Sequence, residues 1–170
     1  MAVNRTNSTS NGFAGNQVLY SSRNFWSGLL FGIGLIAFMD EVFFHQLLQW
    51  HHFYDLATTR TGILSDGLLN SFAWFAAIFS LFMLSDLRRR NALWPVKWTG
   101  AAFLGAGSFQ LFDGLIHHKV LNLHQIRYGV DILPYDLVWS ISAAIFIAIG
   151  LFILSQTRIA KRKKAGNSHA

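Results

Sequence analysis

Apolar residues form four long runs along the chain, separated by short polar segments. The runs cover about residues 25–50, 66–87, 94–118 and 135–156. Each is close to the ~20 residues that a helix needs to cross the hydrocarbon core of a bilayer. Five of the six tryptophans lie near the ends of the runs, where interfacial aromatic residues anchor membrane helices. The pattern predicts an all-α protein, a four-helix transmembrane bundle.

The two ends of the chain do not share this pattern. Residues 1–24 are rich in Asn, Ser, Thr and Gly, a composition that predicts a disordered tail. The segment of residues 157–170 is short, polar and basic. We therefore expect one membrane domain over residues 25–156, flanked by two tails.

Composition supports a membrane protein and excludes several other classes. Hydrophobic residues make up 52% of the chain and charged residues only 13%, against about 25% charged residues in a soluble domain. Cysteine is absent, which excludes disulfides and thiolate ligands. The net charge is +6, but the basic residues flank the apolar runs, so we expect no nucleic-acid partner. The lipid bilayer is the expected partner, and a second copy of the chain or another membrane protein is a further candidate.

The basic residues also predict an orientation. Eleven of the 14 Lys and Arg lie in the N-terminal tail, in the C-terminal tail, or in the loop between the second and third runs together with Lys97 at the start of the third run. Because cytoplasmic loops carry the excess of positive charge, both termini and this middle loop are expected in the cytoplasm.

The first and third runs end in the same polar pattern, D-x4-H-x5-H, with an offset of 73 residues (113−40, 118−45, 124−51). The matched residues are Asp40, His45 and His51 in the first copy, and Asp113, His118 and His124 in the second. Further matches at an offset of 70, such as Asp66 with Asp136, extend the similarity into the second and fourth runs. The chain is therefore predicted to contain two parallel two-helix repeats, residues 25–87 and 94–156, related by an axis along the membrane normal. That symmetry would bring the two polar segments together at the outer side.

The polar segments predict a metal site. Ionisable residues within membrane spans are costly and usually functional. Imidazole and carboxylate without thiolate suit Cu, Zn, Fe or Mn. The six matched residues are the candidate ligands, enough for two metals; alternatively, the two carboxylates orient the imidazoles. Secondary candidates are Glu41, His52 and His117, and of these Glu41 and His52 have no counterpart in the second copy.

Helical periodicity refines this expectation. At about 100° per residue, positions i, i+4 and i+11 fall within ~40° of one another. Asp113, His117 and His124 then form one stripe, and His118 lies on the neighbouring stripe. This arrangement requires the helices to continue through Gln49 and Asn122 at the membrane edge.

Three other interpretations remain open at this point. His45 and His118 are spaced to act as axial ligands of a bis-histidine haem that carries electrons. The acids and histidines also suit an ion or proton pathway. The third interpretation is a structural or assembly partner without a cofactor. Asp66 and Asp136 are interpreted as N-caps of their helices, or else as acids that lean into the cluster.

The two polar segments resemble a known family. D-E-V-F-F-H-Q-L-L-Q-W-H-H and F-D-G-L-I-H-H-K-V-L-N-L-H-Q-I-R are similar to segments of the small bacterial integral-membrane proteins of domain-of-unknown-function family 2243. The resemblance covers nearly all of residues 25–156. Glu41 stands where this family commonly has Gly, which adds an acid to the segment. The resemblance implies a four-span protein of the bacterial cytoplasmic membrane, but it implies no activity.

Overall fold

The chain folds into four long helices, two of which end in a π-helical segment. The computed structural model describes residues 6–166, with side chains for residues 18–157. The elements are α1 (Thr6–Asp40) continuing into η1 (Glu41–Leu47), α2 (Thr59–Arg89), α3 (Pro95–Phe112) continuing into η2 (Asp113–Val120), and α4 (Leu133–Gly166). The predicted all-α class, with four helices packed together, is confirmed.

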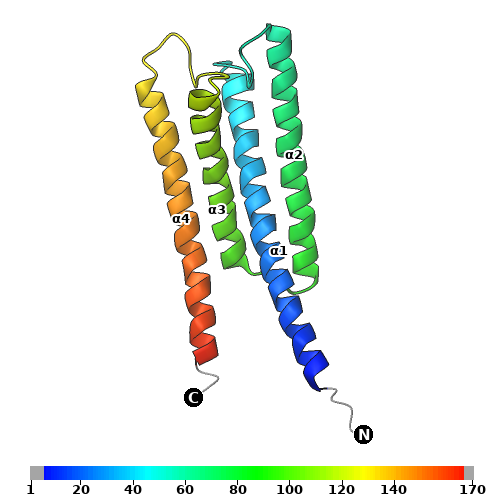
Figure 1. Cartoon of the computed structure of the whole chain (residues 1–170). Helices are drawn as coiled ribbons and strands as arrows, with labels where there is room; N and C mark the ends of the chain where they lie inside the picture. Colours follow the sequence, from blue (N-terminus) through cyan, green and yellow to red (C-terminus); the bar gives the residue numbers. More distant parts are fainter. Residues whose placement is uncertain (1–5, 167–170) are drawn as a thin grey trace.

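The four helices stand side by side in the order α4, α3, α1, α2 (Figure 1). The central pair is α1 and α3; α2 packs on the outer side of α1, and α4 packs on the outer side of α3. Both ends of the described chain lie at one end of the row, and η1 and η2 lie together at the opposite end. The internal repeat itself stays a prediction.

Glycines bring the two central helices into close contact. A Cβ atom at Gly32 would lie 1.9 Å from the Ala102 carbonyl oxygen, and one at Gly105 would lie 2.1 Å from the Leu29 carbonyl oxygen. Such small residues let helix backbones approach where no hydrophobic effect drives helices together. The central pair therefore holds η1 and η2 side by side.

A reciprocal pair of hydrogen bonds joins α1 to α2 near the other end. The Ser27 hydroxyl donates to the Ser80 carbonyl oxygen at 3.0 Å, and the Ser80 hydroxyl donates to the Ser27 carbonyl oxygen at 2.7 Å. Both residues are fully buried. Interhelical bonds of this kind contribute about 0.6–2 kcal/mol each in membrane proteins.

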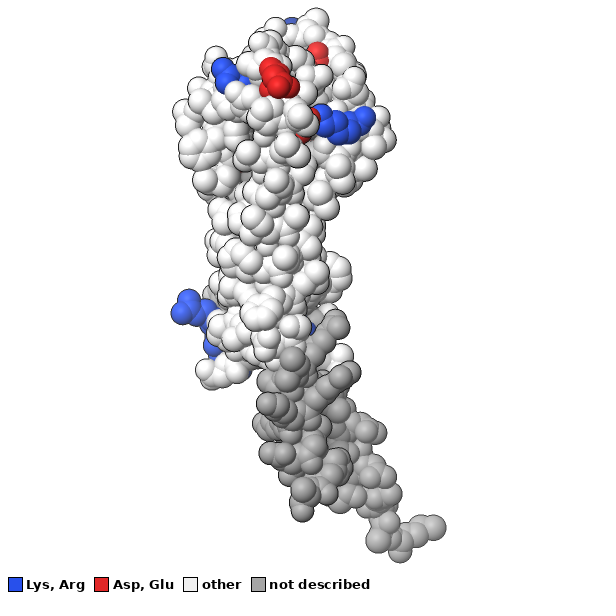
Figure 2. Space-filling view, turned by 90° about the vertical axis from the view of Figure 1, so that its left-hand side faces the viewer, with Lys and Arg blue, Asp and Glu red and all other residues white. Residues whose placement is uncertain are grey.

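Within the described residues, three helical segments are long and apolar enough to cross a membrane: Val18–Leu47, Thr59–Arg89 and Leu133–Thr157. Between the two ends of the molecule, the face seen in Figure 2 shows a belt without Lys, Arg, Asp or Glu. The central helix α3 is rich in Gly and Ala and has 18 residues. It packs against α1 and α4, so its composition suits helix–helix contact more than contact with lipid.

Several helix boundaries differ from those expected. α1 begins at Thr6, so helix replaces the expected disordered tail over residues 6–24, and residues 1–5 lie outside the described residues. A formed span lowers the cost of extending a helix, because each added residue gains one backbone hydrogen bond without a new nucleus. α2 begins at Thr59, and its N-cap is Thr58, whose side chain accepts from the Thr61 amide.

Asp66 is therefore not an N-cap, which corrects the first of the two interpretations given above. It lies within α2 and is buried.

Candidate metal centre

The helix ends position the polar residues through matching hydrogen bonds. The Leu48 amide donates to the Phe43 carbonyl at 2.9 Å, and the Leu121 amide donates to the Ile116 carbonyl at 2.8 Å. These bonds span five residues, as in a π-helix. Each helix then ends at a residue in the left-handed region, Gln49 with φ 51° and Asn122 with φ 49°.

This ending corrects the predicted helical stripe. The helix does not continue to His51 or His124, and both lie in loops beyond η1 and η2. In an α-helix, residues i and i+5 point roughly 140° apart. A π-helical turn brings them onto one side because its backbone bonds span five residues. Asp113 accordingly contacts both His117 and His118.

Three buried histidines from the two chain segments form the first cluster: His51, His118 and His124. One ligand atom from each lies within 4.8 Å of the others. The rings of His51 and His124 stack at 4.6 Å between centroids, and the His118 ring lies 4.6 Å from that of His124. The structure thus brings together three of the six predicted main ligands in one group.

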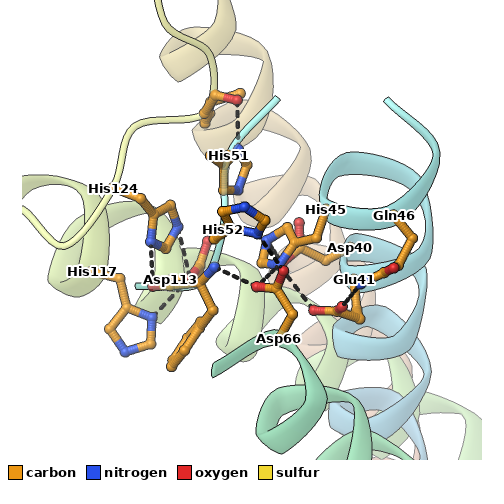
Figure 3. A network of polar contacts seen from close by, with 12 residues as sticks. Asp40, Glu41, His45, Gln46, His51, His52, Asp66, Asp113, His117 and His124 are labelled. Atoms are coloured by element: carbon orange, nitrogen blue, oxygen red, sulfur yellow. Dashed lines mark hydrogen bonds and ion pairs between the residues drawn. The ribbon is translucent and has the colours of Figure 1, made fainter. Parts of the chain in front are cut away.

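Each loop histidine is held by the opposite segment (Figure 3). His51 Nδ1 donates to the Ile126 carbonyl oxygen at 2.8 Å, and His124 Nδ1 donates to the Phe53 carbonyl oxygen at 2.8 Å. The two bonds are equivalent under the 73-residue offset (124−51, 126−53). A backbone carbonyl on Nδ1 is a common arrangement for metal-binding histidines, because it fixes the tautomer and leaves Nε2 as the ligand atom.

Electrostatics keep these two imidazoles neutral. Burial, followed by the neighbouring imidazoles of His45 and His124, lowers the pKa of His51 to about 2. Burial also lowers the pKa of His124 to about 4. Both rings are therefore neutral at pH 7, the form that binds a metal ion.

Three nitrogens of neighbouring imidazoles are buried without a hydrogen-bond partner: His45 Nε2, His118 Nδ1 and His124 Nε2. A buried polar atom without a partner costs about 1–3 kcal/mol. These three nitrogens are therefore available to coordinate a metal ion.

Asp113 is the carboxylate closest to the three histidines. Its Oδ1 accepts from His117 Nδ1 at 2.8 Å, and its Oδ2 lies 3.0 Å from His118 Nε2. The counterpart Asp40 is more distant, with its Oδ2 3.9 Å from His45 Nε2. Asp113 thus lies where a carboxylate orients imidazoles, and His117 contacts the cluster through that carboxylate.

A second cluster surrounds His45 and is richer in oxygen. His45 Nδ1 lies 2.9 Å from Glu41 Oε2 and 3.1 Å from Asp66 Oδ1. The other Asp66 oxygen is 2.6 Å from His52 Nδ1, and the other Glu41 oxygen accepts from Gln46 at 2.7 Å. Glu41, His45 and Asp66 are all buried and have ligand atoms within 4.8 Å of one another. The two residues without a counterpart, Glu41 and His52, thus both belong to this cluster.

In the second half, a tryptophan ring fills the space that corresponds to the side chain of Glu41. Gly114 stands at the position of Glu41, and a Cβ atom on it would lie 2.6 Å from Cδ1 of Trp139. The Trp139 indole donates to the Gln110 carbonyl oxygen, which fixes the ring there. Asp136 lies in the first turn of α4 and pairs with Lys119, outside the cluster.

A haem between His45 and His118 does not fit this geometry. The His45 ring lies 4.5 Å from that of His51 and 6.1 Å from that of His124. The His118 ring also contacts these same two imidazoles. Two side chains therefore occupy the space in which a porphyrin would have to lie.

Asp66 was the most important residue that sequence reasoning left undecided. Its Oδ1 accepts from the Phe53 amide at 2.7 Å in addition to contacting His45. Its place at the start of an apolar run gave the N-cap interpretation. The available signal was the eight-residue segment Thr58–Ser65, which is compatible with an earlier helix start at a Thr cap.

Comparison with known proteins gives one match. A family model described as Predicted membrane protein (DUF2243) matches residues 27–157. This range contains both histidine segments, the whole of α2 and α3, and parts of α1 and α4. Among the curated proteins and among the solved structures, no significant match was found.

Proposed function

The chain belongs to the family of predicted membrane proteins DUF2243, and from that premise we propose that it binds a transition metal ion at His51, His118 and His124. The proposed site lies near the outer face of a bacterial cytoplasmic membrane. It serves metal handling or redox chemistry. Three imidazole ligands suit Zn, Cu, Fe or Mn.

One observation carries this proposal. The three imidazoles are buried, two have Nδ1 committed to backbone carbonyls, and His118 Nδ1 and His124 Nε2 have no hydrogen-bond partner. A structural role alone would favour paired nitrogens, since unpaired ones are costly in a low-dielectric interior. A bound metal removes that cost.

A three-histidine set leaves a position of a tetrahedral metal open for a further ligand. Asp113 lies beside two of the imidazoles, with Oδ1 3.9 Å from His124 Nε2 and Oδ2 3.0 Å from His118 Nε2. It orients these rings, and its negative charge balances the positive charge of the metal.

The orientation follows from the positive residues. The connection between α2 and α3 lies at the opposite end of the row from η1 and η2 (Figure 1), and the basic run 88–90 leads into it. With that basic end in the cytoplasm, the histidine clusters lie on the outer side.

The test is metal analysis of the purified whole chain in mild detergent. We expect an equimolar transition metal, measured by mass spectrometry, that is lost on His118→Ala and on His124→Ala. His52→Gln is the matched control, because His52 belongs to the other cluster, and it should retain this metal. A Soret band in the visible spectrum would contradict the proposal, and so would a folded protein that binds no metal.

A further inference from the structure

We infer that the cluster around His45 is a second metal position, which takes an oxygen-preferring divalent cation such as Mn²⁺ or Fe²⁺. Its three residues offer ligand atoms within 4.8 Å of one another, and the atoms that face each other are Glu41 Oε2, His45 Nδ1 and Asp66 Oδ1. The inference rests on the proposed function only where His45 is treated as a ligand shared with the three-histidine site.

The donor atoms have the separations that a small cation requires. His45 Nδ1 is 2.9 Å from Glu41 Oε2 and 3.1 Å from Asp66 Oδ1. A metal with bonds of about 2.0–2.2 Å has ligand atoms roughly 3–3.6 Å apart. A small opening of the cluster is therefore enough to admit an ion.

The cluster has more acceptors than donors. His45 Nδ1 can donate only one hydrogen, but it faces two carboxylate oxygens, Glu41 Oε2 at 2.9 Å and Asp66 Oδ1 at 3.1 Å. Two buried carboxylates that face one ring nitrogen in a membrane interior are costly. A cation bound between them offsets that cost.

The carboxylate oxygens that point away from His45 are held by hydrogen bonds. Gln46 holds one oxygen of Glu41 at 2.7 Å, and His52 holds one oxygen of Asp66 at 2.6 Å. Outer partners of this kind orient the first ligands of a metal. Figure 3 shows both carboxylates turned toward His45 from η1 and α2.

The ligand set predicts which ion binds. Two carboxylates and one imidazole favour Mn²⁺ or Fe²⁺, whereas three imidazoles favour Cu or Zn. Gly114 and Trp139 close the equivalent place in the second half. Of the two halves, as far as the structure describes them, the first has such a position and the second does not.

His45 links the two positions. Its Nδ1 faces the acids, and its buried Nε2 is unpartnered on the side of Asp40. The His51 ring lies 4.5 Å from it. An imidazole that binds through both nitrogens holds two metals roughly 6 Å apart, given metal–nitrogen bonds of about 2 Å.

The experiment adds Mn²⁺ to the metal-free whole chain in detergent and measures bound Mn²⁺ by electron paramagnetic resonance. We expect Glu41→Gln and Asp66→Asn to weaken Mn²⁺ binding at least about 10-fold. Both variants should keep Cu²⁺ at the three histidines, whereas His124→Ala should lose that Cu²⁺ and keep Mn²⁺. Asp136→Asn is the matched control and should keep both ions.

Glu41→Gln is the decisive variant, because Asp66 also accepts from the Phe53 amide and its loss alters the loop. Mn²⁺ binding that is unchanged in Glu41→Gln, or absent from the unsubstituted chain, would overturn the second position. Failure of the three-histidine site would show instead in the Cu²⁺ measurement. With both ions bound, we expect Mn²⁺ to attenuate the Cu²⁺ signal, and an unchanged Cu²⁺ signal would overturn the shared role of His45.

Discussion

The segments η1 and η2 end their helices in the same way but surround themselves with different side chains. In both, an amide reaches back five residues and a left-handed residue then turns the chain. In η1, Glu41 lies beside Asp66 of α2; in η2, Gly114 lies against Trp139 of α4. One backbone arrangement thus supports an acidic surrounding on one side and an apolar one on the other.

This difference separates the role of the backbone, which places the imidazoles, from the role of a few side chains, which decide what other donor atoms lie beside them. The backbone places His45 in η1 and His118 in η2, and it places the matched pair His51 and His124 in the two following loops. The residue that follows the aspartate, Glu41 or Gly114, decides whether oxygen donors can join. Substitutions at these few positions should therefore change the type of metal without changing the helices.

The largest expected effect is a loss of stability on substitution at the contact between α1 and α3. Gly32→Leu places a side chain where a Cβ atom alone would lie 1.9 Å from the Ala102 carbonyl oxygen. We expect the free energy of unfolding to fall by at least about 3 kcal/mol, because backbone atoms cannot move aside as side chains do. Thermal unfolding in detergent measures it.

Gly67→Leu on α2 is the control, since a Cβ atom there meets no atom within 4 Å. Equal thermal midpoints for the two variants would mean that α1 and α3 are not in close contact at this glycine.

A smaller effect should separate the two aspartates. Asp113 accepts from His117 at 2.8 Å and lies 3.0 Å from His118, whereas Asp40 lies 3.9 Å from its nearest imidazole nitrogen, on His45. We expect Asp113→Asn to weaken metal binding at the three histidines by about 10–100-fold. Asp40→Asn should weaken it by less than about 10-fold. Competition with a chelator gives both affinities, and equal losses would contradict the assignment of Asp113 as the orienting carboxylate.

The smallest expected effect is a change in stability on substitution of the residues that turn the chain after η1 and η2. Gln49 and Asn122 both adopt a left-handed conformation, which Asn tolerates better than Gln. Gln49→Gly should therefore raise the free energy of unfolding by about 0.5–1 kcal/mol, and Asn122→Gly should raise it by less. Gln49→Val should lower it. Chemical unfolding in detergent tests the order, and a larger gain at Asn122 would contradict it.

The sequence was sufficient to predict four packed helices and the residues that meet at one end. The 73-residue offset matched His51 with His124 and His45 with His118, and the structure places all four imidazoles in contact. A metal site of histidine and acid remains a proposal, supported by these contacts.

Two features could not be predicted from the same patterns. Hydrophobic periodicity assumes one helical geometry, so it does not detect a π-helical turn, which brings His118 as well as His117 to Asp113. The carbonyls that hold His51 and His124 belong to Ile126 and Phe53. Backbone acceptors carry no residue-specific signal, and only the folded chain selects them.

The crossed hydrogen bonds between the loops have a consequence for biogenesis. All three ligands of the acid-rich position, Glu41, His45 and Asp66, belong to the first helical hairpin. Two of the three histidines of the other position belong to the second hairpin, and the carbonyl that orients His51 belongs to the loop after η2. During synthesis the acid-rich position is complete once the first hairpin has inserted, while the three-histidine position must wait for the whole chain. The two metals would therefore be acquired at different stages of membrane insertion.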